Sequence, residues 1–317
     1  MIIKLQNTKI EKLIILGAGA SGATAAIIAG QASLNPLVVQ DIDCETQMAL
    51  IHEIDNYPGV LEKIDGIELL NKFRRQAQHF GARFEKGSII KANLLSRPFR
   101  LDFANGKAVY TDALIIASGT KKTWLGLSGE TELKGKGVTG AAFCKDTDFI
   151  DKTVIVVGGG RAALQEAHHV SDRAARIILL NQSDRFYASQ FHQQLVFDNE
   201  KIDIYYHMSV ENILNVSKGF VTGVVVRNHK TDEQIVIPAD VVLVAIGSTP
   251  NSELFRDQLE LAPSGKIRIH GKNTSTNIPG VFAAGDVTDV ACGRVAIASG
   301  AGAAAALDAI DYLDSLT

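Results

Sequence analysis

The chain has 317 residues, of which 46% are apolar and 21% are charged, and its formal net charge at pH 7 is −3. This length accommodates two domains with their own cores, and this composition excludes disordered and fibrous proteins. The weak net charge produces no field that would gather nucleic acid or an anionic membrane, so we expect neither as a partner. We also expect no metal, because the three cysteines lack the spacing of metal ligands.

The amino-terminal region does not resemble a targeting or membrane segment. Charged side chains interrupt the first twelve residues, so they lack the apolar core of a signal peptide. The uncharged run Leu13 to Ala29 is short for a bilayer, and its glycines and other small residues lower its hydropathy. Only three cysteines occur, which is typical of a reducing compartment, so we predict a cytoplasmic protein in which any disulfide is catalytic or regulatory.

A dinucleotide-binding fingerprint follows the first predicted strand. The apolar residues 13–16 predict a buried parallel strand, and Gly17, Gly19 and Gly22 then have G-x-G-x-x-G spacing before an alanine-rich helix. In such a turn the first glycine allows the tight bend, the second lets the backbone approach a pyrophosphate, and the third lets helix and strand pack closely. The helix amino terminus then directs its amide groups at the phosphates.

The elements that follow complete a first domain. Gln40 and Asp41 end a second strand, LNPLVVQD, at the place where such folds hold the adenosine ribose. After a long connection the patterns predict an amphipathic helix, two antiparallel strands and a buried strand before a glycine turn, over 67–80, 82–91, 99–110 and 113–119. The second antiparallel stretch is interrupted by a turn signal at Asn105-Gly106.

The same pattern restarts in the second half of the chain. TVIVVGGGRAALQEA at 153–167 is a strand, glycine turn and helix, and VVLVAIGSTPN at 241–251 repeats ALIIASGTKK in the same relative place. Two such architectures imply two nucleotide cofactors, or one cofactor and a vestigial site. At the second site we predict phosphate contacts from Gly158, Gly160 and Arg161, although Arg161 also fits an exposed residue that starts a helix. The last segment predicts a strand ending at Gly285-Asp286 and a helix beginning near Val295.

Over essentially its whole length the chain resembles the low-molecular-weight thioredoxin reductases. The motifs that carry the resemblance are GAGASGATAA at 17–26, EIDNYPG at 53–59, ALIIASGT at 113–120, GKGVTG at 135–140, VVGGGRAALQEA at 156–167, AIGSTPN at 245–251 and TNIPGVFAAGDV at 276–287. The resemblance implies a flavin-dependent oxidoreductase that acts on thiols and disulfides. It also implies a homodimer.

The resemblance further implies an α/β fold with two Rossmann-like domains, each built in three ββα layers, the second inserted in the first. The FAD-binding domain would comprise 1–123 and 250–317, and 124–249 would form a degenerate NADPH-type domain. The residues implied in FAD binding are Gly17, Gly19, Ala20, Ser21, Gly22, Gln40, Asp41, Gln47, Asn56, Gly119, Gly285, Asp286, Arg294 and Val295.

For two of these residues, a chemical argument independent of the resemblance also supports a role in FAD binding. A carboxylate after a glycine turn, Asp286, can accept from a ribitol hydroxyl, or it can cap the following helix. Arg294 stands where the family has a glutamine, and a cation at a helix amino terminus near the flavin pyrimidine would stabilise an anionic reduced flavin. A surface salt bridge is the alternative for Arg294.

The redox motif departs from that of the family, which has C-x-x-C followed by an acid. In this chain the first cysteine is replaced by Ala141, the flavin-proximal cysteine is kept as Cys144, and the acid is replaced by Lys145. Without the attacking thiol this motif cannot reduce a thioredoxin disulfide. Because Lys145 favours the thiolate, the sequence indicates electron flow from thiol to flavin.

A second thiol is needed to complete such a reaction. Cys44, in the predicted FAD loop, and Cys292, before the last helix, are the candidate partners of Cys144, and three cysteines leave three pairings open. Alternatively, Cys144 is a small apolar residue in a core.

The second nucleotide site departs as well. Where the family has two arginines that bind the 2′-phosphate of NADPH, this chain has Asn181, Gln182 and Ser183. Losing two charge-assisted hydrogen bonds costs roughly 3 to 6 kcal/mol, so NADPH is not expected to bind. NAD is not favoured either, because no acid ends the strand. Both departures resemble the diflavin-linked disulfide oxidoreductases of cyanobacteria, in which a second FAD sits against the first and electrons pass from a dithiol to the flavins. The resemblance implies that this site could be empty or could hold a second FAD.

Three functions compete at this stage. The first is an FAD enzyme that oxidises a protein or small-molecule dithiol through Cys144 and passes the electrons to a second FAD or another acceptor. The second is a flavoprotein reductase fed by ferredoxin or a weakly bound NAD(P)H, without a catalytic thiol. The third is a non-catalytic FAD-binding protein.

Overall fold

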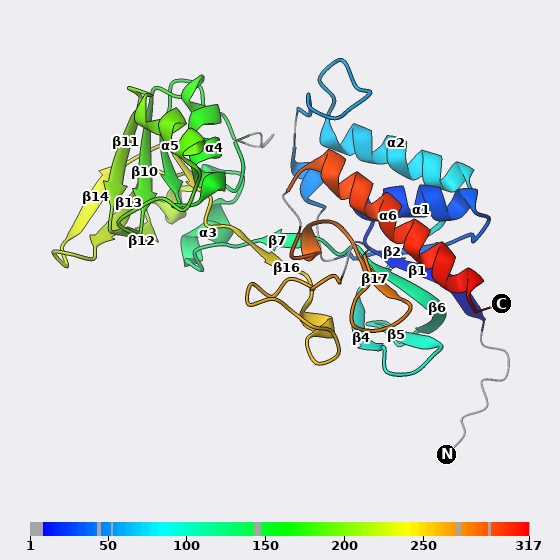
Figure 1. The fold of residues 1–317 in the computed structure, drawn as a ribbon. Coiled ribbons are helices and arrows are strands. Elements are labelled where there is room, and N and C mark those ends of the chain that lie inside the picture. Colours follow the sequence, from blue (N-terminus) through cyan, green and yellow to red (C-terminus); the bar gives the residue numbers. More distant parts are fainter. Residues whose placement is uncertain are drawn as a thin grey trace. The chain divides into compact units, whose positions relative to one another are not determined.

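In a computed structural model, the structure describes residues 9–42, 46–51, 53–142, 147–270, 274–290 and 293–316 (Figure 1). The chain divides into two compact units, one formed by residues 1–121 and 249–317 and the other by residues 122–248. The chain crosses between them at β7 (Thr120–Lys122) and β16 (Ser248–Pro250), which pair in a two-stranded sheet.

The first unit is built on one mixed sheet with the strand order β3-β2-β1-β6-β5-β4, and β17 also pairs with β6. The strands are β1 (Ile10–Leu16), β2 (Leu37–Gln40), β3 (Arg83–Lys86), β4 (Ile89–Asn93), β5 (Phe99–Phe103), β6 (Ala108–Ile116) and β17 (Val281–Ala283). β3, β2, β1, β6 and β17 run parallel, whereas β5 is antiparallel to β4 and β6.

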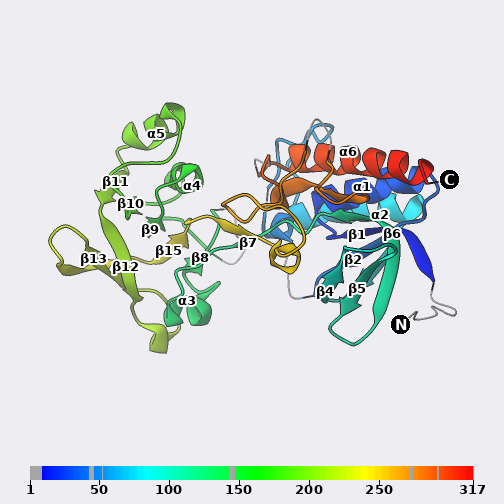
Figure 2. The ribbon, with the colours of Figure 1, turned by 60° about the horizontal axis from the view of Figure 1, so that its bottom comes forward.

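Three helices cover one face of the parallel part of this sheet. They are α1 (Ala20–Gln31), α2 (Gly66–His79) and α6 (Val295–Asp314), and they lie side by side in both views (Figure 2). Short 3-10 turns occur at Gln47–Leu50, Glu253–Phe255 and Gly285–Val287. Small residues let α1 and α6 approach closely, since a Cβ at Gly302 would lie 2.0 Å from the backbone oxygen of Ser21.

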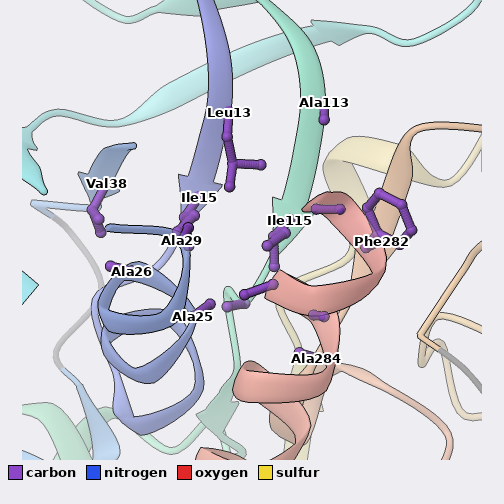
Figure 3. Packing of buried hydrophobic residues seen from close by; sticks show 14 of the residues in the cluster. Leu13, Ile15, Ala25, Ala26, Ala29, Val38, Ala113, Ile115, Phe282 and Ala284 are labelled. Atoms are coloured by element: carbon purple, nitrogen blue, oxygen red, sulfur yellow. The ribbon is translucent and has the colours of Figure 1, made fainter. Parts of the chain in front are cut away.

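The parallel strands are apolar on both faces because both faces are covered. Leu13 and Ile15 of β1 pack with Ala25 and Ala29 of α1 and with Phe282 of β17 in the layer between sheet and helices (Figure 3). The alternate residues of β1 pack on the opposite face against the antiparallel strands, in a cluster that includes Ile14, Leu16, Phe99, Leu101 and Phe103. Burial of both faces explains why the strand reads as a continuous apolar run.

One prediction from the sequence is wrong for this unit, namely a single antiparallel strand over 82–91. The stretch 82–91 is two strands, β3 and β4, and β3 pairs parallel with β2 rather than antiparallel. The stretch 108–116 is one strand, β6, which pairs with β5 at its beginning and with β1 along its length. Alternation of apolar residues is the same for both strand directions, so the sequence did not distinguish them. The turn at Asn105-Gly106 does connect β5 to β6, with Gly106 at a φ of 85°.

The second unit repeats the three-layer plan. Its parallel sheet has the order β11-β10-β9-β15-β8, formed by β11 (Ile202–Tyr206), β10 (Arg176–Asn181), β9 (Thr153–Val157), β15 (Val241–Val244) and β8 (Val138–Thr139). α4 (Arg161–Ser171) and α5 (Gln190–Phe197) cover one face. The antiparallel strands β12 (Met208–Ile213), β13 (Gly223–Asn228) and β14 (Gln234–Pro238) cover the other, near α3 (Ser128–Leu133) and a 3-10 turn at Val216–Lys218. The predicted α/β class with two Rossmann-like units is confirmed.

None of the helices in the described part of the chain is long and apolar enough to cross a membrane.

Candidate functional site

The first unit contains a cavity of about 490 Å³ at the carboxyl ends of its parallel strands. Leu16 ends β1, Gln40 ends β2 and Ala117 follows β6, and all three line the cavity. The helix α1 begins at its wall, since Gly19, Ala20 and Ser21 are also lining residues. Ligands of open parallel sheets bind in this position, outside the carboxyl ends of the strands.

The glycine turn before α1 is shaped by two close backbone approaches. A Cβ at Gly17, whose φ is 109°, would lie 2.1 Å from the backbone oxygen of Ala117, and a Cβ at Gly22 would lie 1.9 Å from that of Gly17. Gly19 caps α1 with no side-chain hydrogen bond, and a Cβ there would first meet Thr46 at 3.6 Å. The turn is therefore fixed by Gly17 and Gly22, while the backbone at Gly19 remains accessible to a phosphate.

The lining of the cavity includes the residues that we predicted for the adenosine ribose. Gln40 and Asp41 both line it. The hydroxyl of Ser88 donates to Asp41 Oδ1 at 2.6 Å, which fixes the orientation of the carboxylate.

Further polar groups line the same cavity. Gln47 Nε2 donates to the backbone oxygen of Thr120 at 2.6 Å and also contacts its hydroxyl. Asp286 Oδ1 accepts from the amide of Gly293 at 3.2 Å, just before Arg294, which caps α6. Gly119, Asp286, Arg294 and Val295 line the cavity with Gln47.

Three of the residues predicted to bind FAD do not line the cavity. Asn56 is exposed and is not among the lining residues. Gly22 and Gly285 are not lining residues either, but both shape the turn region: Gly285 has a φ of 75°, and a Cβ there would lie 2.5 Å from Ser21 Oγ. Ser118 and Asn251 line the cavity and were not singled out from the sequence, although Asn251 ends the motif AIGSTPN.

The second unit has an equivalent turn between β9 and α4. Gly158 has a φ of 147°, and a Cβ there would lie 2.4 Å from the backbone oxygen of Ala245, as Gly17 approaches Ala117 in the first unit. Gly160 caps α4, and Arg161 is its exposed first residue. The internal repeat seen in the sequence thus extends to the geometry of the phosphate-type turn.

The end of β10 carries Asn181, which forms hydrogen bonds within the loop that follows. Asn181 is buried, its Nδ2 donates to the backbone oxygen of Arg185 at 2.9 Å, and its Oδ1 accepts from the amide of Ser183 at 3.0 Å. The amide of Tyr187 donates to the backbone oxygen of Gly159 at 2.8 Å. Tyr187 is 62% exposed, and the guanidinium of Arg185 lies over its ring, 5.5 Å from the centroid. The side chain of Asn181 therefore bonds to the backbone of its own loop.

The four residues of the predicted redox centre, Cys44, Cys144, Lys145 and Cys292, lie outside the described residues. The backbone that leads to Cys144 is described as far as Ala142, which is buried. Its amide donates to Glu166 Oε2 at 2.5 Å, and its oxygen accepts from Arg173 Nη2 at 2.7 Å. Burial raises the pKa of Glu166 above the usual carboxyl range. Within the described ranges, no three or more metal-ligating side chains cluster.

Comparison with known proteins places this geometry in a family. The pyridine nucleotide-disulphide oxidoreductase family matches residues 11–305. The chain is 38% identical to a thioredoxin reductase of Coxiella burnetii, over 96% of this chain and 97% of the relative. It is 37% identical to that of Escherichia coli O157:H7, over 98% of each. The chain belongs to the thioredoxin reductase family.

Solved thioredoxin reductases share the fold. The structure from Giardia duodenalis is 31% identical with a TM-score of 0.74, covering 96% of this chain and 98% of the other. That from Lactococcus lactis is 27% identical with a TM-score of 0.81, covering 96% and 99%. The predicted enzyme class, a thioredoxin reductase-like flavin-dependent oxidoreductase that acts on disulfide or dithiol groups, is confirmed.

Proposed function

We propose that this member of the thioredoxin reductase family oxidises a dithiol through Cys144 and FAD, instead of reducing thioredoxin with NADPH. The observation that carries the proposal is Ala141, which occupies the position of the attacking thiol in the family motif. A methyl group cannot attack a disulfide, so the two-thiol cycle of a thioredoxin reductase is not available. Cys144 retains the flavin-proximal position, and Lys145 beside it favours the thiolate.

The residues of the first unit fit FAD. The glycine turn leaves the α1 amino terminus accessible to a pyrophosphate, Asp41 is oriented by Ser88 for a ribose, and the cavity continues to Gln47 and Arg294. When bound, FAD accepts the two electrons that are released, with two protons, when a dithiol becomes a disulfide. The second thiol of that pair belongs to Cys44, to Cys292 or to the substrate.

We further propose that the second unit holds a dinucleotide other than NADPH, and a second FAD is our choice. The turn at Gly158 supports binding of a pyrophosphate, because it repeats the geometry of the turn at Gly17. The engaged amide of Asn181 supports loss of nicotinamide selection.

Two measurements test these proposals. Gently purified protein should contain two FAD per chain, and one FAD per chain contradicts the diflavin proposal. Dithiothreitol should reduce the flavin of the wild-type protein, and the Cys144→Ser variant should lose this reaction at least tenfold. Unchanged reduction in Cys144→Ser rejects dithiol oxidation through this thiol and favours a reductase fed by ferredoxin or NAD(P)H. Cys44→Ser and Cys292→Ser are matched variants, and the one that also loses the reaction identifies the partner thiol.

The proposed assembly is a homodimer, as implied by the family resemblance. Sedimentation velocity should give twice the mass of the chain, and a monomer at micromolar concentration contradicts it.

A further inference from the structure

The second unit contains a groove that the proposed redox and nucleotide sites do not use. It has a volume of about 660 Å³ and is lined by the end of α4, by α5 and by the segment 198–201 that leads to β11. The two helices pack against each other, and α4 ends at Ser171 and α5 at Phe197 (Figure 1). The carboxyl ends of two helices therefore border the groove.

Acidic side chains occupy both helix ends. Asp172 and Asp198 are the carboxyl-terminal cap residues of α4 and α5, and Glu200 is a further carboxylate in the lining. Asp198 accepts from the neutral amide of Gln194 at 2.6 Å, whereas Asp172 and Glu200 are exposed. Because the carboxyl end of a helix carries a partial negative charge, a carboxylate there is unfavourable for the helix. Helix stability therefore does not explain these carboxylates.

Lys201 shows which charge this place accepts. Its Nζ donates to the backbone oxygens of Ser171 and Ala174, at 2.9 and 3.0 Å, and so satisfies carbonyl groups at the end of α4 and just beyond it. Among the described residues that line the groove, no other lysine or arginine occurs. Three carboxylates thus share the groove with one ammonium group, so a further cation is attracted there.

An apolar surface lies beside these charges. Phe191 is 69% exposed, and Leu195 lies one turn further along the same face of α5, and both line the groove. Exposed apolar side chains with a polar rim mark sites of interaction. His168 also lines the groove, and its buried Nδ1 has no hydrogen-bond partner in the part of the chain that the structure describes. A polar group of an occupant could supply this missing bond.

We propose that this groove docks a basic amphipathic segment of a partner protein. A lysine or arginine of the segment pairs with Asp172 and Glu200, and an apolar side chain beside it packs on Phe191 and Leu195. The described part of the chain brings no three metal-ligating side chains together, so these carboxylates do not form a metal site. A protein segment is favoured over a small organic cation because it can bury the exposed ring of Phe191. The proposal depends neither on Cys144 nor on a bound nucleotide.

The probe is a rhodamine-labelled peptide of lysine and leucine at helical spacing, and fluorescence anisotropy measures its binding to the full-length protein. The Kd should be micromolar and should rise with salt, because exposed charges are screened. The same peptide with glutamate in place of lysine should not bind. Asp172→Asn combined with Glu200→Gln should raise the Kd roughly fivefold through loss of two exposed ion pairs. Phe191→Ser should raise it by roughly the same factor through loss of apolar contact.

Matched changes on the same unit are the controls. Glu132→Gln combined with Glu211→Gln removes two exposed carboxylates outside the groove, and Phe220→Ser removes an exposed ring outside it. These controls should leave the Kd unchanged. The variants at Asp172, Glu200 and Phe191 should keep the wild-type Tm, because each replaced side chain is exposed.

Absence of peptide binding overturns the proposal, as do binding of the glutamate peptide and equal effects of groove and control variants. Spermine that displaces the labelled peptide at a lower concentration than unlabelled peptide does would overturn it in favour of a small organic cation. Groove variants that change the sedimentation coefficient of the protein without any peptide would overturn it in favour of a contact between two copies of the chain. If Phe191→Ser does not fold, the variant that lacks both carboxylates decides alone.

Discussion

The side chains of Ser118 and Asn251 bond reciprocally to each other's backbone. Asn251 Nδ2 donates to the oxygen of Ser118 at 2.8 Å, and Ser118 Oγ donates to the oxygen of Asn251 at 2.8 Å. The two residues follow β6 and β16, 133 positions apart in the chain, and both line the cavity of the first unit. The pair thus joins the two segments at which the chain leaves and re-enters this unit.

Asn251→Ala removes one of the two side-chain hydrogen bonds of this pair and should weaken FAD binding about fivefold, because one net hydrogen bond contributes about 1 kcal/mol. The measurement is the Kd of FAD for the apoprotein, from the quenching of flavin fluorescence. Asn277→Ala is the matched control: its side chain also bonds to the backbone of the first unit, at Glu260 and Gln258, but it does not line the cavity. Equal effects of the two changes contradict this prediction.

Gly22→Ala and Gly19→Ala should separate folding from cofactor binding. A Cβ at Gly22 meets the backbone oxygen of Gly17 at 1.9 Å, so this variant should lose several degrees in Tm even without cofactor. A Cβ at Gly19 has room in the protein, and its φ of −73° suits alanine, so the apoprotein should keep its Tm. The same Cβ lies where the pyrophosphate should approach, so Gly19→Ala should lose FAD. A Gly19→Ala protein with full FAD content would place the pyrophosphate elsewhere.

Arg294→Met should lower the two-electron midpoint potential of the flavin. The guanidinium and the amino terminus of the long helix α6 both line the cavity and favour negative charge in it. Loss of about 1.4 kcal/mol of stabilisation corresponds to about 30 mV. Potentials are measured by equilibration with a reference dye, and the exposed Arg75→Met on α2 serves as control. An unchanged potential would favour a surface role for Arg294.

The double substitution Gln182→Arg and Ser183→Arg should restore NADPH binding. Each charge-assisted hydrogen bond to a 2′-phosphate contributes about 1.5 to 3 kcal/mol, so the two together should raise the affinity about a hundredfold or more. NADH lacks this phosphate and is the control ligand, whose affinity should not change. Wild-type protein that already binds NADPH at micromolar concentration would contradict the proposed loss of selection.

Glu166 should make the stability of the protein fall as pH rises. Burial raises its folded-state pKa above the ordinary value of 4.5, so the folded protein binds more protons than the unfolded chain between these two values. This contribution to stability is fully present below pH 4.5 and is lost as pH rises through the raised pKa. Urea unfolding of wild type and Glu166→Gln across pH 4 to 8 should show a smaller fall in the variant. Parallel curves would show that Glu166 does not titrate in this way.

The sequence by itself determined the class of fold, the two glycine turns and the departures of the redox motif. Each of these depends on local backbone geometry or on the chemistry of a single position. The roles of Gly17 and Gly158 could be predicted from the sequence because only glycine fits a positive φ beside a close carbonyl. The loss of the attacking thiol could be predicted from Ala141 because a methyl group cannot act as a thiol.

Only the tertiary structure decided which distant groups meet. The pairing direction of β3 depends on where the chain returns to the sheet. Alternation of side chains is the same for parallel and antiparallel strands, so it does not indicate this direction. The contact of Glu166 with Ala142 joins residues 24 apart on different elements, and that of Ser118 with Asn251 spans 133 residues. Such pairs form because packing of apolar faces brings their elements together, so neither partner is identifiable from its own neighbours in the sequence.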